Sequence, residues 1–507
     1  MLTTYKQHPR ILVVTPEVGF VHNENGLLPH FISDRACGLG NICIACVHAL
    51  FERGVDVHLA IPKYIYDDEF VSYNQPDLDI YHRQHQLPES NVHLAQDRSF
   101  HYHSRLFIND DWDSVRVALA FQREVIKHII PRVQPDLIHC YDWTTGLIPA
   151  VARRNGIPCL FTLYHTESAK VLLSTIEDQG LNIKSFWEYC FFSRMPDNYA
   201  ESKDTNFLDL LASGIFSASQ VNTLSQTYQD ALVEDGGLHA SPILKSVLKQ
   251  RLREGKLSAL APAPNTSFNP TTDRALFQPY GPSTHATKKA FNKLHLQEIL
   301  NLNMDSTVPV FFWPSRLDGK QPECRLIAET LSMILERYRK QCLQIVFIAG
   351  GDFHDHLRAV VAQLQATDCV AVSNFDVYLY RLAYGGADFL LMPSYFTPCA
   401  LPCMIGQLYG TLSIAYDAGA IHDCVQHLDV KANNGTGFLF KHFNANGFLW
   451  AIDQAMAFYK LSDDLRILQI QRIMKSAMQR FVFEDSVRQI IDLYMKTLNC
   501  SPKTWNA

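Results

Sequence analysis

The sequence predicts an α/β fold, in which strands of a parallel sheet alternate with helices. The clearest sign is the stretch 387–425, where two short apolar runs enclose a helix-like segment. The runs at 389–392 and 412–415 have the length and composition of buried strands. A second sign is the glycine turn at 38–40, which follows the β-branched run 11–14 and opens another apolar segment. Both stretches have the strand, turn and helix order of a parallel sheet.

Two turns in the stretch 387–425 are candidates for ligand binding. Residues 395–401 follow the first strand, at the carboxyl edge where α/β sheets bind their ligands. The turn Ala418-Gly419-Ala420 follows the second strand, and we expect its free backbone amides to face a phosphate.

Length and composition are those of a folded protein with more than one domain. A chain of 507 residues is too long to fold around a single hydrophobic core, which predicts two large domains or three ordinary ones. The 47% hydrophobic and 19% charged residues exclude a disordered chain. A net charge of -6 does not indicate a nucleic acid or an anionic membrane as partner. The sequence has no apolar run of about 18 residues and no secretory signal at its start, which predicts no membrane span and a cytoplasmic location.

The thirteen cysteines are scattered and odd in number, which predicts reduced thiols. Cys43 and Cys46 form a Cys-x-x-Cys pattern without a second pair or a His-x-x-x-His nearby. Helical spacing inside an apolar segment explains this pattern better than zinc or redox chemistry. We therefore expect no metal site and no cofactor, and the sequence does not predict an oligomeric state.

Several motifs together resemble those of bacterial glycogen synthases and plant starch synthases. The family's run Met-Pro-Ser-Arg-Phe-Glu-Pro-Cys-Gly-Leu falls on 392–401, where seven of ten residues match. Tyr409-Gly410-Thr411, Gly419 and Asp423 then follow without a gap, and 220–228 and 434–438 match as well. The resemblance covers nearly the whole chain. It implies a retaining glycosyltransferase of GT-B type, in which two Rossmann-like domains face a central cleft.

The resemblance also implies the domain bounds. Residues 1–262 would form the first domain, on the acceptor side, and 263–482 the second, on the nucleotide-sugar side. A C-terminal helix within 483–507 would cross back to the first domain. The family's hinge sequence Asn-Gly-Ile-Asp falls on Ala261-Pro262-Ala263-Pro264, a stiffer segment with fewer hydrogen-bond donors.

The resemblance assigns several residues to the nucleotide-sugar donor. The family's Lys-x-Gly-Gly-Leu-Gly-Asp loop falls on 35–41, with Arg35 in place of the lysine. Arg316 aligns with an arginine that grips the diphosphate, and Lys320-Gln321 resembles the family's Gln-Lys pair reversed. A plain structural turn and ordinary surface charges are the alternatives. The predicted donor-binding residues are Arg35, Gly38, Gly40, Arg316, Lys320, Gly350, Tyr395, Thr397, Gly419 and Ala420.

Asp142 and His165 are the predicted contacts of the transferred sugar. The family pattern Asp-x-x-His-x-His-Asp-Trp-x-Thr places its aspartate on Asp142, for which capping a helix is the alternative. Counted from Thr162, the family's next histidine falls on Tyr164, so His165 lies one residue late. On a strand such a shift turns a side chain to the opposite face. The predicted catalytic residues are Asp142, His165, Arg316 and Lys320.

The departures from the family pattern gather at this same site. The family's active-site glutamate falls on Thr397, its arginine on Tyr395 and its Thr-Gly-Gly on 418–420. A neutral hydroxyl does not replace the charge of a carboxylate. Two hypotheses follow: a transferase that moves glucose from ADP-glucose or another nucleotide sugar to an α-1,4-glucan, or a catalytically impaired paralogue that binds glucan, nucleotide or a partner protein. A dehydrogenase is disfavoured because Gly-x-Gly-x-x-Gly spacing is missing.

Two further stretches have open roles. Residues 180–202 are rich in aromatic side chains, which either face a glucan or pack a peripheral helix pair. Residues 20–33 are longer than the family pattern requires, and we expect them to reshape or cover the donor site.

Overall fold

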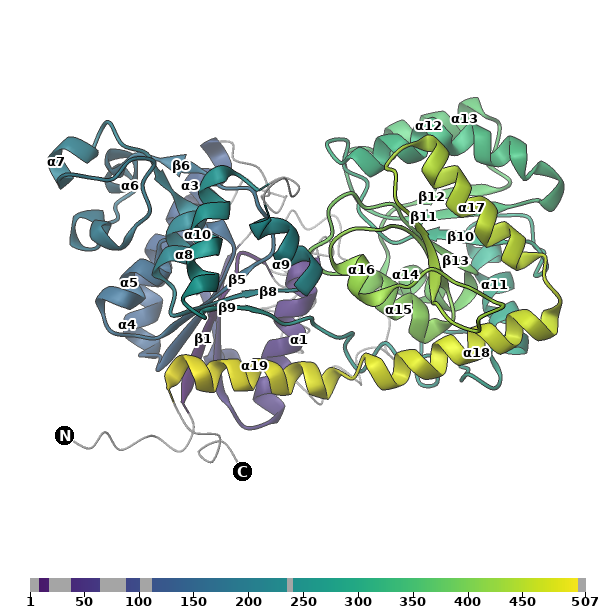
Figure 1. Cartoon of the computed structure of the whole chain (residues 1–507), viewed down its shortest axis with the longest axis horizontal. Coiled ribbons are helices and arrows are strands. Elements are labelled where there is room, and N and C mark those ends of the chain that lie inside the picture. The colour runs from purple at the N-terminus through teal and green to yellow at the C-terminus, as the bar shows by residue number, and fades with distance from the viewer. Residues whose placement is uncertain (1–8, 18–37, 64–87, 101–111, 235–239, 500–507) are drawn as a thin grey trace. The chain divides into compact units, whose positions relative to one another are not determined.

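The computed structural model describes residues 9–17, 38–63, 88–100, 112–234 and 240–499 (Figure 1). The chain forms two compact units. Unit 1 consists of Met1–Ala261 with Glu484–Ala507, and unit 2 of Pro262–Phe483. Each unit is built on a parallel sheet, which confirms the predicted α/β class. None of the described helices combines the length and hydropathy that crossing a bilayer requires.

Unit 1 holds a sheet of seven parallel strands within the described residues, in the order β3-β2-β1-β4-β5-β8-β9. The central strands β4 and β5 are buried along their whole length, as expected for a parallel sheet covered on both faces. The strands are β1 (Arg10–Val14), β2 (Asp56–Pro62), β3 (Val92–Ala95), β4 (Leu137–Tyr141), β5 (Cys159–Leu163), β8 (Gln220–Thr223) and β9 (Leu257–Ala259), and a separate antiparallel pair joins β6 (Lys170–Val171) to β7 (Leu208–Asp209).

Helices cover both faces of the unit 1 sheet. The first and last helices, α1 and α19, pack on one face, and α5 and α8 pack on the other (Figure 1). Cys43 and Cys46 lie in α1, and burial raises the pKa of the Cys46 thiol to about 12. The helices are α1 (Gly38–Glu52), α3 (Trp112–Glu124), α4 (Ile130–Val133), α5 (Ile148–Arg154), α6 (Leu173–Asp178), α7 (Tyr199–Ser202), α8 (Leu210–Ser217), α9 (Gln226–Val233), α10 (Pro242–Arg253) and α19 (Phe483–Leu498).

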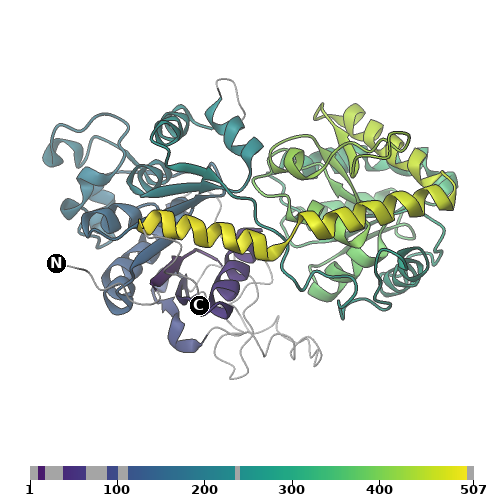
Figure 2. The same ribbon diagram turned by 60° about the horizontal axis from the view of Figure 1, so that its bottom comes forward.

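The C-terminal helix α19 is fixed to unit 1 by a buried chain of polar side chains. The Tyr494 hydroxyl lies 2.8 Å from Nδ1 of His139 on β4. The Nε2 atom of the same ring lies 2.8 Å from the Thr162 hydroxyl on β5. Burial lowers the pKa of His139 to about 3, so the imidazole is neutral and joins two partners without a buried charge. Figure 2 shows the helix, in yellow, lying along this unit.

Unit 2 holds six parallel strands within the described residues, in the order β12-β11-β10-β13-β14-β15. Alternate residues of β10 point to two separate cores: Phe311 packs with α12, α13 and α17, and Phe312 packs with α14 and α15. The elements are β10 (Val310–Trp313), β11 (Gln344–Ile348), β12 (Val370–Ser373), β13 (Phe389–Met392), β14 (Leu412–Tyr416), β15 (Gly437–Phe440), α11 (His285–Ile299), α12 (Pro322–Arg337), α13 (His354–Gln363), α14 (Val377–Gly386), α15 (Leu401–Tyr409), α16 (Ala420–Cys424), α17 (Ala445–Tyr459) and α18 (Asp463–Arg480).

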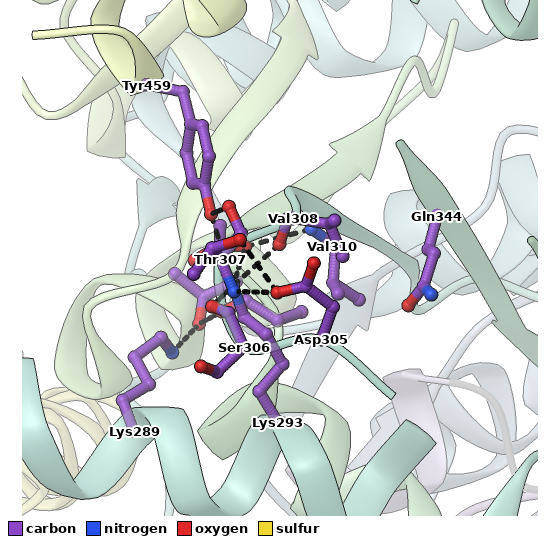
Figure 3. Close-up of polar contacts among 12 residues, drawn as sticks. Lys289, Lys293, Asp305, Ser306, Thr307, Val308, Val310, Gln344 and Tyr459 are labelled. Atoms are coloured by element: carbon purple, nitrogen blue, oxygen red, sulfur yellow. Dashed lines mark hydrogen bonds and ion pairs between the residues drawn. The ribbon is translucent and has the colours of Figure 1, made fainter. Parts of the chain in front are cut away.

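Two buried lysines of α11 tie the interior of unit 2 together (Figure 3). The Lys293 ammonium donates to the carbonyls of Ser306 and Val308 at 3.2 and 2.8 Å and pairs with Asp388 at 2.7 Å. Lys289 donates to the Thr411 hydroxyl at 2.7 Å and to the Tyr384 carbonyl at 3.0 Å. The family-like Tyr409-Gly410-Thr411 motif therefore has a structural partner inside the unit.

The aromatic stretch 180–202 differs from the predicted helix pair. It forms the 3₁₀ turns Ile183–Ser185 and Trp187–Tyr189, followed by the four-residue α7. The Trp187 ring makes edge-to-face contacts with Phe192 at 6.1 Å and Tyr199 at 5.7 Å. These rings pack on one another, as the packing alternative predicts.

Candidate active site

The strand order of unit 1 reverses between β1 and β4, so the sheet has its topological switch point there. Ligands of parallel α/β sheets bind outside the carboxyl ends of the strands at such a point. Glu17 follows β1 and Asp142 directly follows β4, and both are buried. Unit 1 thus places two carboxylates where its topology predicts a site.

Asp142 has a backbone conformation that few residues other than glycine adopt. Its φ and ψ are 60° and 177°, and only 3% of its surface is exposed. Such a conformation costs about 1–3 kcal/mol and persists only where the surroundings enforce it. Here the Asp142 carboxylate accepts the amide hydrogens of Tyr164 and His165 at 2.8 and 3.0 Å. The side chain makes no capping bond to the 3₁₀ turn that follows, so the helix-capping alternative is wrong.

His165 faces Asp142, with Nδ1 2.6 Å from the carboxylate Oδ2. Burial opposes charge on this imidazole, but the charge and hydrogen bond of Asp142, with smaller effects of Glu167 and Glu17, raise its pKa above the ordinary value. The carboxylate also fixes the proton on Nδ1, which leaves Nε2 to contact a ligand. Strand alternation does not apply to His165, because β5 ends at Leu163.

The glycine turn at the start of α1 lies against the same residues. A Cβ atom on Gly38 would lie 2.3 Å from the Tyr164 hydroxyl, so a side chain at this position would require the Tyr164 ring to move. The Gly40 amide donates to Glu17 Oε1 at 3.3 Å, which places a carboxylate at the positive end of the helix. The sequence analysis did not identify Glu17 as a candidate site residue, although a polar residue that closely follows a predicted strand often lies at a ligand site. Arg35 lies outside the described residues.

Unit 2 has its own switch point, between β10 and β13. Arg316 lies in the loop after β10 and is partly exposed, and Lys320 lies further along the same loop and is exposed. Neither the guanidinium nor the ammonium pairs with an acidic side chain in the described ranges of the chain. Both cations are therefore accessible to an anionic ligand.

Backbone contacts fix the Arg316 loop against the turn after β11. The Leu317 amide donates to the Gly350 carbonyl, and the Phe353 amide donates to the Leu317 carbonyl, both at 3.0 Å. Gly351 has a φ of 146°, and a Cβ atom there would lie 1.8 Å from the Leu317 carbonyl oxygen. A Cβ atom on Gly350 would meet no atom within 4 Å. The turn thus requires glycine at 351 and not at the predicted ligand Gly350.

Thr397 and the turn at Gly419 are also held together through the backbone. The Ala420 amide donates to the Thr397 carbonyl at 2.9 Å, and a Cβ atom on Gly419 would lie 2.5 Å from that oxygen. The Ala418 amide donates to the Tyr416 carbonyl at 2.9 Å. The prediction that the backbone amides of this turn are free to face a phosphate is therefore wrong for Ala418 and Ala420, because both amides donate to carbonyls of the protein.

The Thr397 hydroxyl is buried without a partner. Thr397 is 4% exposed, and among the described residues its Oγ1 atom has no hydrogen bond. An unsatisfied buried hydroxyl costs about 1–3 kcal/mol, so such atoms in native proteins call for a physical explanation. A bound ligand that reaches Oγ1 would supply one.

Tyr395, at the family's arginine position, joins an aromatic cluster. Its ring stacks on Tyr416 at 5.7 Å and meets the edge of Phe443 at 4.7 Å. These three rings line a cavity of about 490 Å³. Nearby, burial raises the pKa of Glu323 on α12, against the opposing hydrogen bonds of the Tyr395 amide and the Ser394 hydroxyl. Sequence reasoning did not identify this buried carboxyl group.

Comparisons with known proteins agree with the motifs. The starch synthase catalytic domain family model matches residues 10–245. The glycogen synthase of Lactobacillus acidophilus is 30% identical over 471 residues, which cover 87% of this chain and 92% of the relative. The glycogen synthase of Thermotoga petrophila is 28% identical over 493 residues, which cover 91% of this chain and 96% of the relative.

Solved structures show the same fold. The catalytic domain of starch synthase IV from Arabidopsis thaliana, bound to ADP and acarbose, matches with a TM-score of 0.75 at 21% identity, over 97% of this chain and all of that one. HepE of Anabaena, in complex with UDP and glucose, matches with a TM-score of 0.55 at 13% identity, over 96% of this chain and all of that one. The fold is of the GT-B type. The chain therefore belongs to the glycogen synthase and starch synthase family of glycosyltransferases.

Proposed function

We propose that this chain transfers glucose from ADP-glucose to an α-1,4-glucan with retention of the anomeric configuration. The observation that carries the proposal is the buried Asp142–His165 pair, held in a strained conformation at the switch point of unit 1. The relatives that match nearly the whole chain are named glycogen synthases, and a solved structural relative binds ADP and acarbose. They do not favour the catalytically impaired paralogue.

In this reaction the bond between glucose C1 and the diphosphate oxygen breaks, and the acceptor hydroxyl oxygen bonds to C1. The acceptor proton passes to the departing phosphate oxygen. Negative charge builds up on the diphosphate, and Arg316 and Lys320, which have no acidic partner among the described residues, are suited to neutralise it. Because this charge is larger in the transition state than in the bound substrate, cations that contact it lower the barrier to the chemical step.

The Asp142–His165 pair would orient the sugar. Asp142 is saturated by two amides and one imidazole, so its role is to hold His165 in one tautomer and one direction. The free Nε2 atom of His165 then hydrogen-bonds a sugar hydroxyl. A positioned contact of this kind reduces the entropy lost on the way to the transition state.

Thr397 would contribute a hydrogen bond to the donor where relatives have a charge. Its unpartnered hydroxyl is placed beside the Gly419 turn, but it cannot stabilise a developing positive charge as a carboxylate does. We therefore expect slower transfer than with a glutamate at this position, by a factor of about 10²–10³.

The proposal is tested by incubating the full chain with glycogen and radiolabelled ADP-glucose or UDP-glucose, and measuring label in the polymer. We expect incorporation from ADP-glucose, and its loss in Arg316→Ala. Arg339→Ala is the matched control, because Arg339 is exposed and lies beyond the far end of α12.

Two outcomes would overturn the proposal. Absence of incorporation from ADP-glucose would exclude it as the donor, and equal loss in both arginine variants would remove the assigned role of Arg316. Retention is checked separately by the anomeric proton signals of the extended chain, which must be those of α-linkages.

A further inference from the structure

A second cavity lies at the edge of the unit 2 sheet, beside the edge strand β15. It has a volume of about 930 Å³ and is lined by residues of α16 and β15, by the segments that follow β14, α16 and β15, and by the first turns of α17. Known ligand pockets have volumes of about 300–1,000 Å³. Neither the family assignment nor the proposed transfer reaction uses this cavity.

One wall of the cavity is a fixed aromatic platform. Trp450 of α17 is 47% exposed, and its ring stacks on His427 with the centroids 5.5 Å apart and the planes inclined by 22°. His427 is in turn held in place, because its Nδ1 accepts the Leu439 amide hydrogen at 3.1 Å. A large, partly exposed ring with a fixed direction is suited to stack on a flat apolar surface of a ligand.

The rest of the cavity combines an apolar floor with polar side chains of both charges. Val425, Leu439 and Phe440 are buried or nearly so and form the floor. Around it stand Asp417, Gln426, Lys441 and Asn446. Asp417 binds His422 at 2.7 Å, and Lys441 is the only lysine or arginine of the lining within the described residues.

These features select the chemical class of the ligand. A phosphate or nucleotide site would need several cations or free helix amides, and this lining contains one lysine, Lys441, and one carboxylate, Asp417, which contacts His422. A pyranose ring has an apolar face of C–H groups and a rim of hydroxyls that donate and accept hydrogen bonds. The exposed Trp450 ring can stack on the apolar face of such a sugar. The amide, imidazole, carboxylate and ammonium groups of the lining can donate to and accept from its hydroxyls.

We propose that the Trp450 cavity binds a segment of a neutral oligosaccharide, specifically an α-1,4-glucan chain. The sugar class follows from the cavity, and the α-1,4-glucan rests on the proposed function. The cavity shares Lys441, His442 and Asn444 with the smaller cavity at Tyr395. A glucan held there remains close to the loops of unit 2 assigned to the donor, which raises the local concentration of chain ends.

The test uses the full chain in native gels cast with and without glycogen, and calorimetric titration with maltoheptaose, which does not depend on Trp450 as the reporter. We expect Trp450→Ala to weaken the affinity for both ligands roughly tenfold or more, as for other stacking aromatic contacts. Trp450→Phe keeps an aromatic face and is expected to retain part of the affinity. Trp112→Ala is the matched control, because Trp112 is 56% exposed and lies in unit 1.

The outcomes separate this proposal from the proposed transfer. Trp450→Ala is expected to transfer glucose to maltotriose from ADP-glucose at the wild-type rate, because no donor contact is removed. Glycogen retardation equal to that of the wild type in Trp450→Ala, or an equal loss in Trp112→Ala, would overturn the glucan cavity. Absence of transfer with intact, Trp450-dependent glycogen binding would overturn the transfer reaction and leave the cavity standing.

Discussion

The two units build the carboxyl edges of their sheets in different ways. In unit 1 the site consists of side chains that bind one another: the Asp142 carboxylate accepts two amides and the imidazole of His165. In unit 2 the site consists of turns that are joined through their backbones, at Leu317 with Gly350 and at Thr397 with Ala420. In unit 1 Asp142 keeps the family residue, although the family's next histidine falls on Tyr164, and in unit 2 Arg316 keeps it, although Tyr395 and Thr397 do not.

This difference separates positions where the backbone geometry fixes the residue type from positions where it does not. Where a glycine or a backbone bond sets the shape, as at Gly351 and Gly419, the residue type is fixed by sterics. A side chain that projects from such a turn is replaced without loss of shape. Unit 2 thus keeps the turns at the edge of its sheet while the side chains at 395 and 397 depart from the family pattern, and the four predictions below test this contrast.

Asp142→Asn is expected to have the largest effect, because the contacts of unit 1 depend on one charge. The rate of transfer to glycogen falls by about 10²–10³, as for the removal of one positioned electrostatic contact. Asparagine has nearly the shape of aspartate and keeps a side-chain oxygen that can accept the Tyr164 and His165 amide hydrogens, so we expect the fold to be retained. The pKa of His165, followed by NMR, falls when the carboxylate charge is removed. Asp113→Asn, in an exposed position of α3, is the control. An unchanged rate would remove Asp142 from the catalytic set.

Gly351→Ala tests whether backbone geometry holds unit 2. Alanine would need a φ of 146° and would place Cβ 1.8 Å from the Leu317 carbonyl oxygen. We expect the free energy of unfolding to fall by about 3 kcal/mol or more. Gly350→Ala has open space for its methyl group and is expected to change this free energy by less than about 0.5 kcal/mol. Urea unfolding followed by fluorescence measures both, and similar losses in the two variants would contradict the contrast.

Lys289→Met tests the polar interior that supports the Tyr409-Gly410-Thr411 motif. Burial lowers the pKa of Lys289 from 10.5 to about 7, so above pH 7 the unfolded chain binds more protons than the folded one. The stability of the wild type relative to Lys289→Met must then rise with pH, by about 1.5 kcal/mol between pH 7 and 8.5. Urea unfolding at both pH values measures this difference. A constant difference would show that Lys289 does not titrate in this range.

Thr397→Val is expected to have the smallest effect on stability and the most specific effect on binding. Replacing an unsatisfied buried hydroxyl by a methyl group raises the free energy of unfolding by up to about 1 kcal/mol. The affinity for ADP-glucose, measured by calorimetry, falls several-fold because the ligand loses a hydrogen bond. Ser413→Ala removes another buried hydroxyl that lacks a partner among the described residues, on β14, and leaves the affinity unchanged. Equal affinity in both variants would exclude Thr397 as a donor contact.

The sequence predicted the central elements of the fold well. The strand expected at 389–392 is β13, because a continuous apolar run that ends at a proline leaves little choice of bounds. The strand expected at 412–415 extends one residue further, to Tyr416. The helix-like segment expected between these two strands is α15, Leu401–Tyr409. Local patterns define the apolar part of a helix better than its ends.

The sequence alone also determined the family, because its motifs recur at fixed spacing along nearly the whole chain. Through the resemblance it also predicted site roles for Asp142, His165, Arg316 and Thr397. Only the tertiary structure decided which of these side chains meet. The contact of Asp142 with His165 requires a positive φ at one residue and the end of β5 at another. The Gly40 amide reaches Glu17, and the Trp450 cavity brings together separate elements and loops between residues 417 and 450. Such contacts depend on packing across the sheet, which no local pattern of residues encodes.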